Sequence, residues 1–230
     1  MKNVFMPKWK KAFSIIAIMS MVIGVSIALG ETVFSGGVAL GANQTSLGFK
    51  QLSLCGPTGK SLCKVGVMGP GGGTIFFVDY NDIYSTFNYL EAAPLGWSLG
   101  SKTGDPALQW CSDITHSIES TTNEWTSRTV GQGEINSAVM VSACTSGAAN
   151  EVDSFNHSKT NKYSDWFLPS LGELIILTEN LQGLAGLTSS DYWSSSEYSD
   201  VGGWVQSVNH GYQGTATKNT TFKVRPIRSF

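Results

Sequence analysis

DWFLPSLGELIILTENLQGL, residues 165–184, is the stretch that decides the fold. Ser170 and Glu173 form an S-x-x-E capping box, in which the serine hydroxyl accepts from the Glu173 amide and the carboxylate accepts from the Ser170 amide. Gly183 provides a C-terminal stop. The apolar residues recur at helical spacing and predict one buried face, Leu171, Leu174, Ile175, Leu177 and Leu181. The sequence therefore predicts a helix over residues 170–182.

A second helix and several strands accompany this segment. GEINSAVMVSACT (133–145) has helical spacing, with an inward face predicted at Ile135, Ala138, Val139, Val141 and Ala143. TIFFVDY (74–80) follows the turn cluster GPGGG (69–73) and is typical of a buried strand. Residues 81–130 are irregular, with room for a short helix, and three β-like segments come late in the chain, YWSSSEY, GGWVQSVNH and TFKVRPIRSF. We therefore expect an α+β fold with small mixed or antiparallel sheets, two packed helices and long loops.

The N-terminus has the pattern of a secretory signal. MKNVFMPKWKK carries four lysines and no acid, and an apolar run from Ala12 to Gly30 follows it. Ala28 and Gly30 place small residues at the −3 and −1 positions of a cleavage site before Glu31. An uncleaved signal anchor is the alternative, because the apolar run just reaches spanning length. The prediction is a signal peptide over residues 1–30 and an exported protein that is secreted, periplasmic or displayed on the cell surface.

The charge balance argues against one class of partner. The chain has 15 Lys+Arg and 17 Asp+Glu, a formal net charge of −2. Residues 1–30 carry four of the lysines and no acid, so 11 basic and 17 acidic residues remain after cleavage, a net charge of −6. No basic cluster survives, and nucleic acid is therefore not expected as a partner. No membrane contact is expected beyond the signal segment, and the oligomeric state stays open.

The four cysteines predict disulfides. Export places Cys55, Cys63, Cys111 and Cys144 in an oxidising compartment, where an even number of cysteines forms a disulfide framework. Three connectivities are possible. The short loop between Cys55 and Cys63 favours that pair, and Cys111–Cys144 would then be the second. A metal site is the weaker interpretation, because no C-x-x-C occurs and no histidine sits at ligand spacing from a cysteine.

Phosphate-binding loops are not supported by either glycine-rich stretch. GPTGKS (56–61) resembles the end of such a loop, but the pattern needs a glycine at position 54, where Leu54 stands. GPGGG (69–73) has neither the GxGxxG spacing nor a following helix. Both stretches are interpreted as turns.

The sequence gives only weak support for a catalytic or metal-binding site in residues 190–210. The run Ser194–Ser196 is not in a G-x-S-x-G pattern, so no nucleophile elbow is indicated, although His157 or His210 could complete a triad. Oxygen ligands for Ca²⁺ could come from Asp191, Glu197, Asp200 and Asn209, without an EF-hand spacing. Solvated turns, or pairing with Arg225 and Arg228, are simpler roles for these acids. No catalytic residue, metal ligand or cofactor is therefore assigned.

Aromatic and amide side chains suit a different chemistry. Rings stack on the C–H faces of sugars, while amides meet the hydroxyls. We expect Trp193 and Trp204 to be at least half buried, because a tryptophan on a strand usually packs in the core. The predicted ligand-binding residues lie between positions 197 and 221 and are Tyr198, Trp204, Asn209, His210, Tyr212 and Gln213.

Seven ordered blocks carry a resemblance to a known family. They are VGVMGPGGGTIFFVDY, YLEAAPLGW, QWCS, SACTSGAAN, DWFLPSLGEL, YWSSSEY and VRPIRSF. Together they are similar to the C-terminal domain of bacterial collagen-like surface proteins, the Lcl C-terminal domain, which is allied to the C-type lectin-like fold and to the formylglycine-generating-enzyme group. The resemblance covers about residues 63–230, so residues 31–62 are interpreted as a linker or added segment that contains the Cys55–Cys63 loop.

The resemblance implies a compact fold whose first and last strands pair, which would set TIFFVDY beside KVRPIRSF. It also implies that YWSSSEY is a core strand and that the segment 197–221 forms a loop surface with the ligand contacts. Two family activities are not carried over. The sugar-binding signatures of calcium-dependent lectins are absent, and no cysteine follows Cys144, where the oxidases need an active pair. No collagen-like G-X-Y stalk is present either.

These features together predict a non-catalytic, exported or cell-surface binding module. Its expected partner is a glycan or another surface macromolecule, held through residues 197–221. Two alternatives remain open. One is an enzyme similar to the formylglycine-generating group, and the other is a structural envelope protein without a small ligand.

Overall fold

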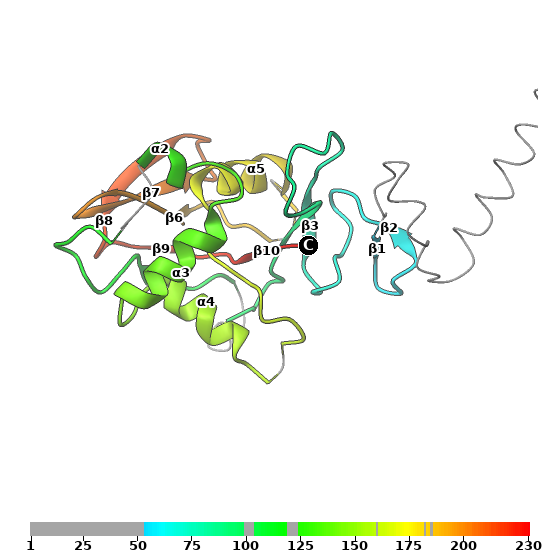
Figure 1. Cartoon of the computed structure of the whole chain (residues 1–230), viewed down its shortest axis with the longest axis horizontal. Coiled ribbons are helices and arrows are strands. Elements are labelled where there is room, and N and C mark those ends of the chain that lie inside the picture. Colours follow the sequence, from blue (N-terminus) through cyan, green and yellow to red (C-terminus); the bar gives the residue numbers. More distant parts are fainter. Residues whose placement is uncertain (1–52, 99–103, 119–123, 160, 182, 185) are drawn as a thin grey trace, which may run out of the picture. The chain divides into compact units, whose positions relative to one another are not determined.

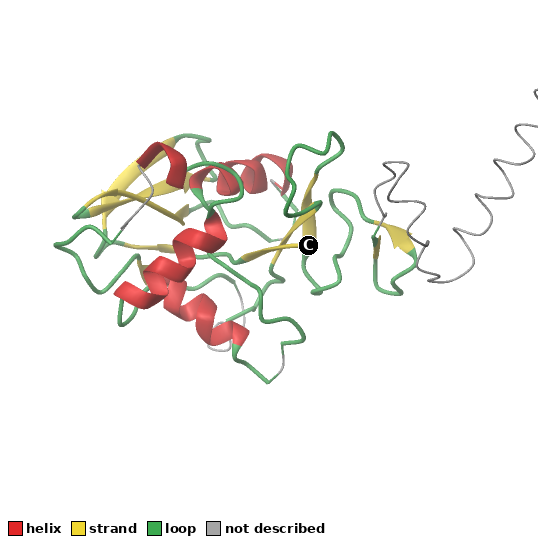
Figure 2. Ribbon diagram, viewed as in Figure 1, coloured by secondary structure: helices red, strands yellow, loops and turns green. Residues whose placement is uncertain are grey.

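The structure is a computed structural model that describes residues 53–98, 104–118, 124–159, 161–181, 183, 184 and 186–230. They belong to one compact unit, Leu52–Phe230. Figures 1 and 2 show helices and short strands mixed along the chain, as expected for an α+β protein. The elements are β1 (Leu54–Cys55), β2 (Ser61–Leu62), β3 (Thr74–Val78), β4 (Tyr89–Ala92), β5 (Ala107–Gln109), α2 (Glu124–Ser127), α3 (Gly133–Ala143), α4 (Ala148–Asn156), α5 (Leu171–Leu181), β6 (Asp191–Ser199), β7 (Gly202–Ser207), β8 (Gln213–Thr217), β9 (Thr221–Lys223) and β10 (Ile227–Ser229).

The described strands form three sheets. β1 and β2 form a hairpin, β10-β4-β3 form a three-stranded sheet, and β5-β9-β6-β7-β8 form a five-stranded sheet. Within the large sheet β6 pairs antiparallel with β7 and parallel with β9. The predicted α+β class with small mixed and antiparallel sheets is therefore confirmed.

The predicted pairing of the first and last strands is wrong. TIFFVDY supplies β3 and KVRPIRSF supplies β10, but β4 lies between them and pairs with both. Ala92 is the register partner of Thr74 on one side and of Ile227 on the other. A strand has two hydrogen-bonding edges, and β4 uses both, so the two terminal strands share a sheet without contacting each other as neighbours.

Strand β6 stands between two hydrophobic cores. Tyr192 belongs to a core with Phe76, Leu174 and Leu177. Trp193, the next residue, belongs to the other core, which also contains Trp110, Met140 and Val205. Successive side chains of a strand point to opposite faces, and this alternation explains how one strand supports both cores. In Figure 1, α5 lies above β9 and β10, and α4 lies below them.

The capping box at the start of α5 is confirmed. The Ser170 amide donates to Glu173 Oε2 at 2.7 Å, and the Glu173 amide donates to Ser170 Oγ at 3.3 Å. The helix runs from Leu171 to Leu181 and Gly183 follows with φ 74°, a conformation that favours glycine. The predicted apolar face is buried at Leu171, Leu174, Leu177 and Leu181, and half-buried at Ile175.

The helix predicted at 133–145 exists as α3, but its predicted inward face is wrong. Ile135 is exposed, and the buried residues are Gly133, Asn136, Ser137 and Met140. The buried polar side chains have backbone partners, which offset the cost of removing them from water. Asn136 Nδ2 donates to the Ser127 carbonyl at 2.7 Å, and the Leu168 amide donates to Ser137 Oγ at 2.9 Å.

Both predicted disulfides are present. Cys55–Cys63 joins β1 to β2 with a Cα–Cα distance of 4.9 Å, and Cys111–Cys144 ties the chain beside β5 to the end of α3 with a distance of 5.4 Å. Cys55 and Cys63 pack against Ile75 of β3. The hairpin is therefore part of the compact unit Leu52–Phe230.

The predicted signal peptide, residues 1–30, and most of the predicted linker, 31–52, lie outside the described residues. Among the residues that the structure describes, no helix is long and apolar enough to cross a membrane.

Three buried ion pairs lock the C-terminal half of the domain. Arg225 donates from Nε and Nη2 to the two Asp105 oxygens at 2.6 and 2.8 Å. Lys218 Nζ pairs with Glu197, and Arg228 Nη1 lies 3.4 Å from Glu91 Oε2. The two arginines therefore pair with acids from much earlier in the chain, and not with the acids of residues 190–200. Because a buried charge is costly without a partner, each pair depends on both members.

Candidate functional site

The triple serine of β6 is a structural junction. Ser194, Ser195 and Ser196 are all buried. Ser194 Oγ donates to the Trp204 carbonyl at 2.9 Å, and Ser196 Oγ donates to the Ser127 carbonyl at 2.8 Å. The two histidines considered for a triad are exposed, and His157 contacts Asp153. These hydroxyls hold strands and helices together, and their geometry offers no nucleophile to a substrate.

The GPGGG turn binds a carboxylate of the protein itself. The amides of Gly71 and Gly73 donate to the two Glu91 oxygens at 3.1 and 2.7 Å. A Cβ at Gly73 would lie 1.9 Å from the Ala92 carbonyl oxygen, so this position requires glycine. Burial raises the pKa of Glu91, while these hydrogen bonds and Arg228 oppose the increase. In this turn the Glu91 carboxylate therefore occupies the position that a bound phosphate would take in a phosphate-binding loop.

The acids considered as Ca²⁺ ligands are not brought together. Glu197 is buried and accepts hydrogen bonds from Lys218 and from the Ile118 amide. Asp191 is the first residue of the nine-residue strand β6 and Asp200 follows its last residue, Ser199, which places the two acids far apart. Within the described ranges, no group of three His, Cys, Asp or Glu side chains is arranged to hold a metal ion.

Strand alternation divides the six predicted ligand-binding residues between two faces of the β7–β8 hairpin. Trp204 pairs in register with Thr215, and Val205 pairs with Gly214. Val205 faces the core, so Trp204 faces outward. Tyr212 lies on the Val205 side, because its ring is 3.5 Å from the position of a Cβ on Gly214. The segment 197–221, predicted as a loop surface, is thus largely a pair of strands with two different faces.

Tyr198 and Gln213 join Trp204 on the outward face. The rings of Tyr198 and Trp204 meet edge to face with centroids 5.4 Å apart, and Gln213 Nε2 donates to Gln206 Oε1 at 2.8 Å. His210 stacks on Tyr212, on the other side of the hairpin, with centroids 5.9 Å apart. Asn209 donates to the Ser189 carbonyl at 3.0 Å and belongs to the turn.

Two residues that the sequence did not single out complete the outward face. The Arg128 guanidinium carbon lies 4.0 Å from the centre of the Trp125 ring and 4.6 Å from the centre of the Trp204 ring. Trp125 is 74% exposed and Tyr198 is 48% exposed. Trp125, Arg128, Trp204 and Tyr198 therefore form a continuous row of contacting groups, two indoles, one guanidinium and one phenol, which we call the aromatic face.

The backbone around Arg128 is fixed from two sides. The Gly172 amide of α5 donates to the Arg128 carbonyl at 2.8 Å, and a Cβ at Gly172 would lie 2.8 Å from that oxygen. The carbonyl of Ser127, the preceding residue, accepts hydrogen bonds from Asn136 and Ser196. A short helix of four residues, α2, therefore presents Trp125 from a rigid support. A tryptophan in the polar run EWTSR is the one sequence signal that could have indicated this position.

The outward face combines flat apolar rings with polar groups. Gln213, Thr215 and Thr217 alternate along β8, are all exposed and lie on the same side as Trp204. Arginine between two indoles is held by cation–π attraction, which contributes about 0.5–1 kcal/mol at an exposed site. The arrangement can stack a ring-shaped ligand and offer it hydroxyl and amide hydrogen bonds.

Comparisons with known proteins identify no family. No protein family profile matches the chain, and no curated protein sequence matches it. Among solved structures, the chain is similar to a fimbrial protein from Bacteroides ovatus ATCC 8483, with 17% sequence identity and a TM-score of 0.42. The match covers 79% of this chain and 49% of the fimbrial chain, so the chain spans about half the length of that protein. A likeness this remote supports no conclusion about function.

Proposed function

We propose that the chain is an exported or cell-surface binding module that holds a glycan or another surface ligand at the aromatic face, without catalysis. The observation that carries the proposal is the 74% exposure of Trp125 on a support fixed by hydrogen bonds. Large apolar side chains gathered at a surface mark sites of interaction. A sugar is a suitable ligand because its C–H face stacks on a ring while its hydroxyls meet polar side chains.

The neighbouring residues fit the same chemistry. Tyr198 adds a second exposed ring beside Trp204, and the row Gln213, Thr215 and Thr217 supplies donors and acceptors on the same side. A few aromatic anchors carry most of the affinity in such interfaces. Display of many copies on a cell surface would raise the overall avidity and would suit a role in adhesion.

The proposed setting draws on the cysteines and on the seven sequence blocks. Disulfides at Cys55–Cys63 and Cys111–Cys144 are typical of proteins in an oxidising compartment outside the cytoplasm. The resemblance to the Lcl C-terminal domain extends the proposal to a C-type lectin-like fold. In that fold family a disulfide-stapled scaffold that presents a ligand-binding surface is the expected mode of action.

A glycan array with the exported protein tests this proposal. We expect the wild-type protein to bind a defined subset of glycans, and the Trp125→Ala variant to lose at least about tenfold in affinity, which corresponds to 1.4 kcal/mol. Trp125→Ala is expected to fold normally because the side chain is largely exposed. Absence of any glycan or cell binding, together with ordered self-assembly, would instead favour a structural envelope protein.

A further inference from the structure

Glu173 is a buried carboxylate that belongs to none of the three buried ion pairs. Glu173 is fully buried, and its oxygens accept hydrogen bonds from the amides of Gly131 at 2.8 Å and Ser170 at 2.7 Å. No lysine or arginine within the described residues forms an ion pair with it. Burial raises the pKa of Glu173 to about 7, although these hydrogen bonds oppose the increase. The charge is therefore uncompensated by any cation of the described chain.

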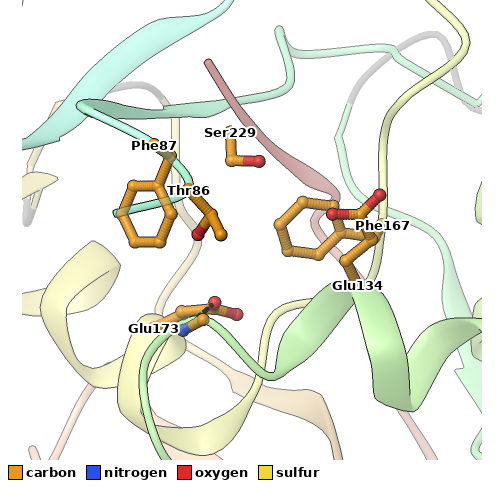
Figure 3. Close-up of a pocket in the computed structure, with 7 residues that line it drawn as sticks. Thr86, Phe87, Glu134, Phe167, Glu173 and Ser229 are labelled. Carbon is orange, nitrogen blue, oxygen red and sulfur yellow. Dashed lines mark hydrogen bonds between the residues drawn. The ribbon is translucent and has the colours of Figure 1, made fainter. Parts of the chain in front are cut away.

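Glu173 is one of the residues that line a cavity of about 70 Å³. Residues from four parts of the chain line it: Thr86, Phe87, Gly131, Glu134, Phe167, Glu173 and Ser229. Figure 3 labels the six of them that have side chains. Glu134 of α3 brings a second carboxylate, and Phe87 and Phe167 bring phenyl rings on opposite sides of the space. The cavity is separate from the aromatic face, since it has no residue in common with it.

These walls match one class of ligand. We infer that the Glu173 cavity binds a primary ammonium group, with Glu173 and Glu134 as counter-charges and the two phenyl rings as cation–π partners. Ser229 and Thr86 supply hydroxyl acceptors for the remaining N–H groups. The volume equals roughly two water molecules, which suits an ammonium with its attached methylene. A Ca²⁺ ion takes six to eight oxygen ligands and gains nothing from phenyl walls.

The geometry also specifies how binding depends on pH. The ionisable groups near Glu173 are Glu134 from α3 and Tyr84 from the segment before β4. Burial, the charge of Asp79 and then the charge of Glu173 raise the pKa of Tyr84. Both neighbours are acids, so neither neutralises Glu173. An entering cation favours the ionised carboxylate, and binding therefore strengthens as pH rises through about 7.

Titration of the exported protein with n-butylammonium chloride, against NaCl and CaCl₂ at equal ionic strength, tests the inference. Binding is followed by calorimetry at pH 6 and pH 8, and by the carbon NMR shift of the Glu173 carboxyl. We expect saturable binding of n-butylammonium alone, stronger at pH 8, with a lowered pKa of Glu173 in the bound state. Lysine side-chain analogues and glucosamine, used as further probes, distinguish a protein source of the ammonium from an amino sugar.

Two variants make the result specific to the cavity. Glu134→Gln removes a wall carboxylate from an exposed helix position and is expected to weaken binding about tenfold. Glu179→Gln changes an exposed acid of α5 that does not line the cavity, and it should bind as the wild type does. Non-saturable binding, equal binding of NaCl or CaCl₂, or equal effects of the two variants would each overturn the inference. Loss of glycan binding by Trp125→Ala would not affect the inference about the cavity, because the two sites share no residue.

Discussion

Tyr198 and Tyr212 are almost equally exposed, at 48% and 51%, yet they lie on opposite faces of the β7–β8 hairpin. Tyr198 contacts the ring of Trp204, and Tyr212 lies over Gly214 on the side of Val205. The two tyrosines therefore form a matched pair. One belongs to the aromatic face and the other does not, while the expected cost of either substitution to folding is similar.

The Arg128 guanidinium is predicted to position Trp125 through its planar shape as well as its charge. Arg128→Lys keeps the charge but loses the planar guanidinium, whose carbon lies over both indole rings. We expect ligand affinity to fall several-fold, toward the value of Arg128→Met, because each cation–π contact contributes about 0.5–1 kcal/mol. Titration followed by tryptophan fluorescence measures the ligand affinity of each variant. Wild-type affinity in Arg128→Lys would show that the stacking is unimportant.

The capping box is predicted to contribute measurably to stability. Ser170→Ala removes the hydroxyl that accepts from the Glu173 amide at the start of α5. Loss of an N-cap costs about 0.5–2 kcal/mol, and we expect the upper half of that range because the site is buried. Urea denaturation measures the free energy of unfolding. Ser154→Ala, at an exposed position on α4, serves as the control and should change it little.

Stability is predicted to decrease as pH rises toward 8. The folded-state pKa of Glu173, about 7, lies above its ordinary value of 4.5. The folded state therefore binds more protons between these values, and the associated stability is complete below pH 4.5 and lost as pH rises through about 7. Burial also raises the pKa of Glu91, which acts in the same direction.

Denaturation of the wild type and Glu173→Gln at several pH values between 5 and 8 isolates this contribution. Glu173→Gln loses one acceptor for the backbone amides, so its stability is lower at pH 5. Its decrease between pH 5 and pH 8 should be smaller than that of the wild type. Parallel pH profiles for the two proteins would show that Glu173 does not titrate in this range.

The two disulfides are predicted to differ in their effect. Cys111–Cys144 closes a separation of 33 residues and Cys55–Cys63 closes one of 8. The loop-entropy estimate gives about 3–4 kcal/mol for the first and about 2–3 kcal/mol for the second. Paired Cys→Ser variants, compared by thermal unfolding, should show the larger loss for Cys111–Cys144, whose sulfurs are in a core with Trp110. The reverse order would contradict the prediction.

Local patterns predicted the elements whose partners are close in sequence. The capping box of α5, strand β3 and the short Cys55–Cys63 loop follow from residues a few positions apart, and all are present. The inward face of α3 could not be predicted in this way. Its buried positions hold Asn136 and Ser137, whose backbone partners come from distant segments.

Strand β4 also contains a buried polar residue whose partners are distant in sequence and could not be predicted from local patterns. YLEA carries Glu91, a charge at a fully buried position, and this acid is tolerated because Gly71, Gly73 and Arg228 surround it. Helix α4, AANEVDSFN, has few large apolar residues, and the sequence analysis predicted no helix there. At the candidate site, the exposed tyrosines could be predicted, but Trp125 and Arg128 join Trp204 only through the tertiary fold.

The most direct test of the central claim compares Tyr198→Ala with Tyr212→Ala for binding to the ligand that the glycan array identifies. If the ligand binds at the aromatic face, Tyr198→Ala loses about tenfold in affinity, while Tyr212→Ala binds as the wild type does. Equal affinities for the two variants, or a larger loss in Tyr212→Ala, would contradict the account.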